Sequence, residues 1–349
     1  MVLSVPHSRP WIEAEDRVAV DEVLKGGMID CGVRVHAFER AVANCLGASG
    51  GIACTSGTAA LCLALKTLGI GAGDEVVLPT YVCWDVLVAV IACGATPCLC
   101  DVDVSGVPTV KTVRAALSSK TRAIVAVHIF GHPCDIASLS QLGLPVIEDA
   151  CQAFGLEING RRAGTAGTLG ILSFHATKCL TTGEGGMLVA SQPDLLERAR
   201  ALSESAEGGN MVSISFMTDM QAALGLAQLK RYPAFLERRR QLFKAYNQVA
   251  GSLATARPGY GGEPLFLFRF TLRVQQGFDA VLLAMLANGV QVRRGVDELL
   301  HRRLGLDDHD FPNAAALFSE TISIPFYPSL GEEEVAWVLC TMQKVFGDA

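Results

Sequence analysis

The chain has 349 residues, of which 50% are hydrophobic and 18% are charged, and its formal net charge at pH 7 is −6. That length permits a large buried core and two domains, and the weakly acidic balance argues against a nucleic-acid-binding surface. No apolar run is long enough to cross a membrane, and the N-terminus lacks the basic and apolar regions of a signal peptide. We therefore expect a cytoplasmic protein without nucleic-acid or membrane partners.

Strands and helices alternate through the first 150 residues. Hydrophobic spacing predicts helices over 12–25, 35–45, 84–92, 110–117 and 133–142. Apolar runs predict strands over 75–78, 96–101, 123–128 and 145–149, and the stretch 51–61 combines a short strand, a tight turn and the start of a helix. This alternation favours a mostly parallel sheet with helices on both faces, in which ligands bind beyond the carboxyl ends of the strands. Four residues follow or end strands and are expected to line one crevice: Ser56, Tyr81, His128 and Asp149.

The rest of the chain predicts a second, smaller α/β unit after a helical stretch. Strands are expected over 169–172, 187–190, 265–274 and 322–325, and helices over 195–202, 219–249, 278–288 and 332–346. A segment rich in glycine and proline, 258–264, is typical of a boundary. We expect a large domain over 1–250 and a small domain over 251–349, with the extreme N-terminus able to pack on the small domain.

Twelve cysteines are scattered along the chain without the paired CxxC spacing of zinc sites. We therefore expect no metal site, and reduced thiols that pack as small hydrophobic side chains. A single lysine, Lys178, lies between the strands 169–172 and 187–190, among small and apolar residues. A poorly hydrated lysine is a candidate for Schiff-base chemistry, although a lone lysine is more often a surface residue in a loop.

The residues around Lys178 resemble a known family. Residues 173–178 have the sequence SFHATK, followed by TTGEGG at 181–186. This combination resembles the cofactor-lysine segment of the DegT/DnrJ/EryC1/StrS family, which comprises sugar aminotransferases that use pyridoxal 5′-phosphate (PLP). The resemblance extends from about Gly27 to Leu229 and more weakly to the C-terminus. It implies the α/β fold of fold-type I PLP-dependent aminotransferases, with a mostly parallel central sheet and a smaller C-terminal α/β domain.

The resemblance also implies roles for individual residues. Lys178 would bind PLP as a Schiff base (an aldimine) and then move protons as general base and acid. Asp149, in the sequence EDACQAFG, would pair with the pyridine nitrogen and keep it protonated, although an aspartate there is also typical of a helix N-cap. Gln152 would lie near the ring face or its phenolic oxygen.

The phosphate of PLP would lie at a turn before a helix. Backbone N–H groups at a helix N-terminus suit a phosphate, and glycine permits close approach, although such a turn is more often only a cap. By the resemblance, Gly57 and Thr58 would bind the phosphate together with the hydroxyl of Ser173. His175 is assigned no chemistry, and Glu184 would either order the glycine-rich turn or contact substrate.

Two positions depart from the family pattern. The family usually stacks an aromatic residue on the PLP ring, and Cys83 occupies that position, next to Trp84. We expect one of the two to cover the ring and favour Trp84, because it offers the larger area. The family also carries an asparagine that reaches the phosphate of the neighbouring subunit, and Ile214 stands there, between two serines.

The function implied is PLP-dependent transamination of a nucleotide-linked keto sugar with glutamate or glutamine as amino donor, by a homodimer. The apolar helical segment Met220 to Leu229 adds a reason to expect a partner subunit. One alternative is a sugar dehydratase of the same family, in which histidine replaces the lysine, so Lys178 argues against it. A second alternative is a non-catalytic regulatory relative, against which the intact set of Asp149, Gln152, Ser173 and Lys178 argues.

Overall fold

A computed structural model describes residues 3–204, 216–259 and 264–347. A central sheet of seven strands has the order β1-β9-β8-β5-β4-β2-β3. The strands are β1 (Gly50–Cys54), β2 (Glu75–Pro79), β3 (Thr96–Cys100), β4 (Thr121–Val127), β5 (Val146–Asp149), β8 (Leu169–Ser173) and β9 (Gly186–Ala190). Only β9 runs antiparallel to its neighbours, because a turn joins it directly to β8. The mostly parallel sheet expected from the sequence is confirmed.

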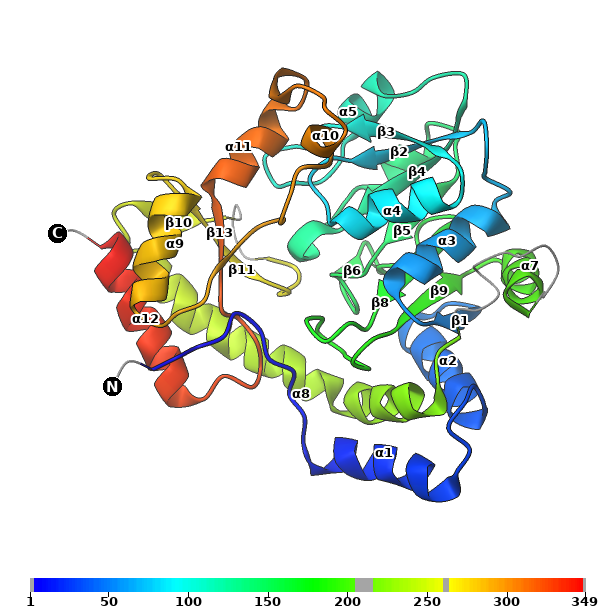
Figure 1. Ribbon diagram of the computed structural model, residues 1–349, viewed down its shortest axis with the longest axis horizontal. Coiled ribbons are helices and arrows are strands. Elements are labelled where there is room, and N and C mark those ends of the chain that lie inside the picture. The colour runs from blue at the N-terminus through cyan, green and yellow to red at the C-terminus, as the bar shows by residue number, and fades with distance from the viewer. Residues whose placement is uncertain (1–2, 205–215, 260–263, 348–349) are drawn as a thin grey trace.

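Helices surround this sheet in the first 250 residues (Figure 1). They are α1 (Ala14–Gly26), α2 (Val33–Leu46), α3 (Gly57–Thr67), α4 (Trp84–Ala92), α5 (Val110–Ala115), α6 (Ile136–Ser140), α7 (Pro193–Glu204) and α8 (Asp219–Ala250), with the short 3₁₀ turn η1 (Ile129–Gly131). A small hairpin of β6 (Glu157–Ile158) and β7 (Arg161–Arg162) lies between β5 and β8. The predicted helix over 84–92 coincides with α4, because its apolar run is bounded by Cys83 and Gly94.

A second, four-stranded sheet has the order β10-β11-β13-β12 and is antiparallel throughout. Its elements are β10 (Ala256–Pro258), β11 (Phe270–Val274), α9 (Phe278–Ala287), β12 (Arg293–Arg294), α10 (Leu300–Arg303), η3 (Asp308–Asp310), α11 (Pro312–Glu320), β13 (Thr321–Ile324) and α12 (Glu332–Phe346). The strand predicted over 265–274 begins only at Phe270. We did not predict β12, which consists of two arginines and carries no hydrophobic pattern.

Two hydrophobic clusters form the interior. The first surrounds the seven-stranded sheet, and the second lies between the four-stranded sheet, α9, α12 and the end of α8. Several buried residues beyond position 250 nevertheless pack into the first cluster, among them Val296, Leu299 and Phe311. Residues 296–317 therefore join the C-terminal part of the chain to the large sheet, and the division at position 250 stays a prediction.

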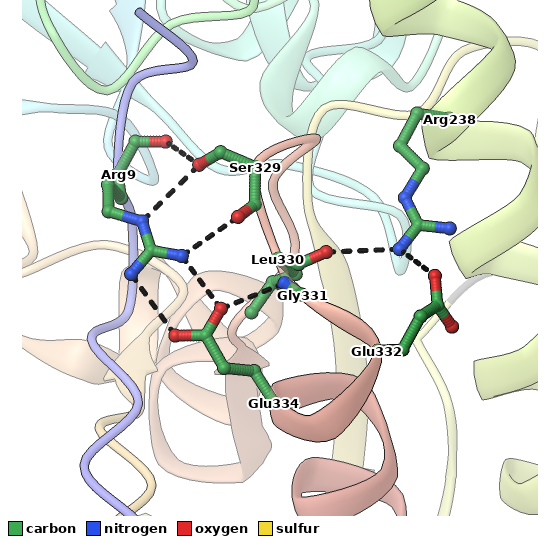
Figure 2. Close-up of polar contacts among 7 residues, drawn as sticks. All are labelled: Arg9, Arg238, Ser329, Leu330, Gly331, Glu332 and Glu334. Atoms are coloured by element: carbon green, nitrogen blue, oxygen red, sulfur yellow. Dashed lines mark hydrogen bonds and ion pairs between the residues drawn. The ribbon is translucent and has the colours of Figure 1, made fainter.

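The N-terminal residues 3–12, here called the N-terminal strap, pack against the C-terminal part of the chain. The backbone N–H of Val5 donates to the carbonyl oxygen of Gly289 at 2.8 Å. Arg9 donates to Glu334 at 2.7 and 3.1 Å and to the carbonyl oxygen of Ser329 at 2.8 Å (Figure 2). The strap is thus fixed on both sides of His7.

Helix α8 spans the molecule from the large sheet to the small one (Figure 1). Its first half packs on α1 and α2. A Cβ atom on Gly225 would come within 2.7 Å of the Phe38 ring, so the helices approach very closely at this glycine. The segment Met220 to Leu229 is therefore partly covered within the chain, because Ala222, Ala223 and Gly225 are buried whereas its leucines are half-buried. The expectation of a second subunit here stays a prediction.

Candidate active site

A cavity of about 570 Å³ lies at the carboxyl end of the parallel strands. Segments next to the four-stranded sheet form its opposite wall. Six of the seven predicted site residues line it: Gly57, Thr58, Asp149, Gln152, Ser173 and Lys178. The cavity therefore brings together six predicted residues that are up to 121 positions apart in the chain.

Asp149 ends strand β5, and its side chain is 5% exposed. The Oδ1 atom accepts a hydrogen bond from the backbone N–H of Cys151 at 2.9 Å. Among the described residues Oδ2 has no hydrogen-bond partner, and the carboxylate lies in the cavity wall. One oxygen thus orients the carboxylate and the other is available to a ligand.

Behind Asp149 lies a buried pair, His128 and Glu148. The Nδ1 atom of His128 accepts from the backbone N–H of Cys134 at 2.9 Å, so Nε2 carries the hydrogen and donates to Glu148 at 2.9 Å. Burial opposes ionisation of Glu148, but His128 and two backbone N–H groups hold its pKa below the ordinary value. His128 and Tyr81 are completely buried and do not line the cavity, so the expectation for these two strand-end residues was wrong.

The start of α3 faces the same cavity. The Ser56 hydroxyl accepts from the N–H of Ala59 at 3.1 Å, and the Ser56 carbonyl accepts from Ala60 at 3.0 Å. The first two helical N–H groups, those of Gly57 and Thr58, then lack a partner among the described residues. A Cβ on Gly57 would lie 3.1 Å from Cβ of Ser173 and 3.2 Å from Sγ of Cys151. This close approach puts the free N–H groups beside the Ser173 hydroxyl, a set that fits a phosphate.

Lys178 is half-buried in the turn between β8 and β9, and its Nζ lies 5.4 Å from the centre of the Phe268 ring. In the same turn His175 Nδ1 accepts from the N–H of Thr177, so its Nε2 hydrogen faces Glu184, 3.4 Å away. His175 and Glu184 thereby hold together the two ends of the turn that carries Lys178.

Gln152 is held by an unusual backbone conformation. Its Oε1 accepts from the N–H of Phe130 at 2.8 Å, and Phe130 has φ of 55°, in the left-handed region. Because the amide oxygen is occupied, the NH₂ group of Gln152 remains to donate to a ligand in the cavity.

The structure separates Cys83 from Trp84. Cys83 caps α4 and lines the cavity, whereas Trp84 is the first helical residue and lies outside the lining. The guanidinium carbon of Arg303 instead lies over the Trp84 ring, 4.0 Å from its centre. Successive helical residues point about 100° apart, which explains why the two side chains diverge. This geometry gives the preference for Trp84 no support and leaves Cys83 as the residue in the cavity wall.

The sequence analysis missed three residues of the opposite wall: His7, Arg269 and Arg293. They come from the N-terminal strap, the segment before β11, and β12. One signal was present, since Arg269 interrupts the apolar run LFLFRFTL at 265–272. Residue 214, the position of the family asparagine, lies outside the described residues.

No helix within the described ranges is long and apolar enough to span a membrane. Where the structure describes the chain, it also brings no three histidine, cysteine or acidic side chains into a metal-binding arrangement.

Comparison with known proteins identifies the family. The profile of the DegT/DnrJ/EryC1/StrS aminotransferase family matches residues 10–343. The chain belongs to this family. Spore coat polysaccharide biosynthesis protein SpsC of Bacillus subtilis is 32% identical over 379 aligned positions, which cover 98% of this chain and 97% of SpsC.

Two further relatives agree. The dTDP-4-dehydro-2,3,6-trideoxy-D-glucose 4-aminotransferase of Saccharopolyspora spinosa is 31% identical, with 96% of this chain and 95% of the relative covered. The crystal structure of the aminotransferase TlmJ from Streptoalloteichus hindustanus superimposes with a TM-score of 0.89 at 29% identity, covering 98% of both chains. The chain is thus a member of a family of PLP-dependent sugar aminotransferases, with their α/β fold.

Proposed function

We propose that this enzyme transfers an amino group from glutamate or glutamine to a nucleotide-linked keto sugar. The observation that carries the proposal is the meeting of Lys178, Asp149 and the α3 N-terminus in one cavity. The relative from Saccharopolyspora spinosa, whose name specifies a dTDP-linked sugar, supports the substrate class. Lys178 argues against the dehydratase alternative, and the complete residue set argues against a non-catalytic relative.

The residues of the cavity fit the cofactor in complementary ways. The N–H groups of Gly57 and Thr58 and the Ser173 hydroxyl would hold its phosphate. The free oxygen of Asp149 would hold a proton on its ring nitrogen, and the NH₂ group of Gln152 would donate to its edge or face. When bound, PLP supplies an electron sink that stabilises negative charge at the carbon beside the reacting nitrogen.

Lys178 is the residue that would carry the cofactor through Nζ. Once released, the amine accepts a proton from the donor's Cα and returns a proton when the sugar is aminated. The Phe268 ring beside Nζ excludes water from one side of the amine, which keeps the basic nitrogen free to react.

Borohydride reduction of the purified enzyme tests this assignment. The mass of reduced PLP should appear on the peptide that contains Lys178, and Lys178→Ala should abolish both the label and transamination. Lys66→Ala is the matched control, because Lys66 is also half-buried but donates to the Cys93 carbonyl, away from the cavity. A label on another lysine would refute the role given to Lys178.

We also propose that the enzyme is a cytoplasmic homodimer. Support comes from exposed apolar side chains around the link between α1 and α2: Met28 is 80% exposed, Ile29 45%, and Val33, the first residue of α2, 76%. Apolar side chains gathered in this way favour a protein contact. Sedimentation should give a dimer that Val33→Asp weakens, whereas a monomer that is fully active at low concentration would contradict the proposal.

A further inference from the structure

We propose that Arg269 and Arg293, together with His7, form a second anion-binding site in the cavity, which takes a carboxylate of the amino donor. The inference rests on the proposed transamination, because it names where one of the two substrates binds. It concerns the wall of the cavity that faces Lys178 from the side of the four-stranded sheet.

Arg269 is held in place without a carboxylate. Its Nη1 donates to the carbonyl oxygens of Gly295 at 3.0 Å and Arg294 at 3.4 Å. Its guanidinium carbon lies 5.5 Å from the centre of the Phe130 ring and 5.6 Å from that of Phe268. The remaining N–H donors have no partner among the described residues, although Arg269 lines the cavity. The guanidinium is therefore positioned but still able to bind an anion.

Neighbouring arginines behave differently. Arg273 pairs with Glu320 at 3.3 Å, and Arg294 pairs with Asp279 at 2.6 Å. Within the described parts of the chain, neither Arg269 nor Arg293 forms an ion pair. Of these four arginines, the two that reach the cavity are thus the two without an ion-pair partner, as expected for a site that receives an anionic ligand.

The pKa shifts in this wall also favour the binding of an anion at Arg269 and Arg293. Burial lowers the pKa of Arg269 to about 10, an effect that Asp297 opposes and Arg293 strengthens. Burial, Arg269 and Arg293 lower the pKa of His7 to about 3, so His7 stays neutral and bonds Ser323 at 3.0 Å. A bound carboxylate would relieve the mutual repulsion of the two guanidinium groups.

The position of the site indicates which anion it takes. Lys178 Nζ and the Arg269 guanidinium both lie within 6 Å of the centre of one ring, that of Phe268. A carboxylate at Arg269 therefore suits a small molecule whose nitrogen reacts near Lys178. The N–H groups that would hold the cofactor phosphate come from the other wall, at Gly57 and Thr58, so the two anions do not compete.

Titration of the PLP-loaded enzyme with glutarate, which is glutamate without the amino group, tests the site by calorimetry. We expect Arg269→Gln to raise the dissociation constant of glutarate at least about tenfold, and Arg293→Gln about threefold because Arg293 is exposed. Arg269→Lys should keep part of the affinity, since it keeps the charge but not the paired N–H donors. Asp297→Asn is the converse control: it removes the cavity-lining carboxylate that acts on Arg269 and should tighten glutarate binding by about twofold.

Uridine diphosphate serves as the second probe. The proposal requires Arg269→Gln to weaken glutarate more than uridine diphosphate, with cofactor content and melting temperature unchanged. The proposal would be overturned if Arg269→Gln weakened uridine diphosphate more than glutarate, or if the wild type and Arg269→Gln bound glutarate equally well. If borohydride still labels Lys178 in that case, only the carboxylate site fails; if Lys178 is not labelled, the proposed function itself fails.

Discussion

The two walls of the cavity are built in different ways. The wall from the seven-stranded sheet presents short side chains and backbone N–H groups, fixed at strand ends and at the first turn of α3. The opposite wall presents two arginines and the neutral His7, which come from three separate segments, one of which is the N-terminal strap. Strand ends place small groups with little freedom, which suits a resident cofactor. Longer side chains on separate segments suit substrates that must enter and leave.

Among changes to the first wall, loss of the Asp149 charge should reduce the rate of transamination the most. Asp149→Asn keeps an oxygen that can accept from the Cys151 N–H, but it removes the charge that would hold a proton on the cofactor ring. We expect kcat to fall by about 10²–10³-fold, or about 3–4 kcal/mol, with PLP still bound. Steady-state kinetics and cofactor absorbance measure the two effects.

Asp85→Asn is the control for this change, because Asp85 is another carboxylate in the cavity lining but, among the described residues, its side chain accepts a hydrogen bond only from Cys83, at 3.3 Å. It should reduce kcat far less. Normal turnover by Asp149→Asn would show that the strand-end carboxylate does not act on the ring.

Closing the space at Gly57 should affect cofactor affinity rather than chemistry. A Cβ at this position would meet Ser173 at 3.1 Å and Cys151 at 3.2 Å, so these side chains or the start of α3 must move by a few tenths of an ångström. We expect Gly57→Ala to raise the dissociation constant of PLP about tenfold, which is about 1.4 kcal/mol. Gly26→Ala is the control, because a Cβ there meets nothing within 4 Å. Equal PLP affinities for the two variants would contradict the assignment of the cofactor phosphate to the α3 N-terminus.

The two walls also differ in how far sequence reveals them. The first wall is encoded in short contiguous segments, SFHATK and EDACQAFG, whose strand and turn pattern fixes where each side chain points. The second wall depends on tertiary packing: His7 reaches the cavity because Arg9 and Val5 fix the strap to distant segments. Two-residue β12 has no hydrophobic period, so no local pattern marks Arg293. Trp84 was preferred on area, but its direction depends on where α4 begins.

Variants of Cys83, which lines the cavity, and of Trp84, which does not, test which of the two covers the cofactor ring. Loss of hydration inside the cavity raises the pKa of the Cys83 thiol to about 12, and the charge of Asp85 adds to this effect. The sulfur is therefore neutral and can pack against a ring. We expect Cys83→Ala to shift the cofactor absorbance and weaken PLP binding by about threefold, with less effect from Trp84→Ala. The reverse order would restore the indole as the ring cover.

The protonation of His7 should affect the stability of the fold rather than the chemistry. Its pKa is about 3 in the folded protein and about 6.5 when unfolded, so between these values only the unfolded chain binds the proton. The stability that depends on neutral His7 is therefore complete above pH 6.5 and declines as the pH falls toward 3.

Urea denaturation at several pH values measures this dependence. His7→Gln removes the titrating group, so its free energy of unfolding should fall less steeply than that of the wild type between pH 6.5 and pH 4. Arg293→Gln should have an intermediate slope, because the removal of one neighbouring charge lets the His7 pKa rise partway toward its ordinary value. Identical slopes for the wild type and both variants would mean that His7 is solvated in the folded protein, and that the strap does not hold it against the cationic wall.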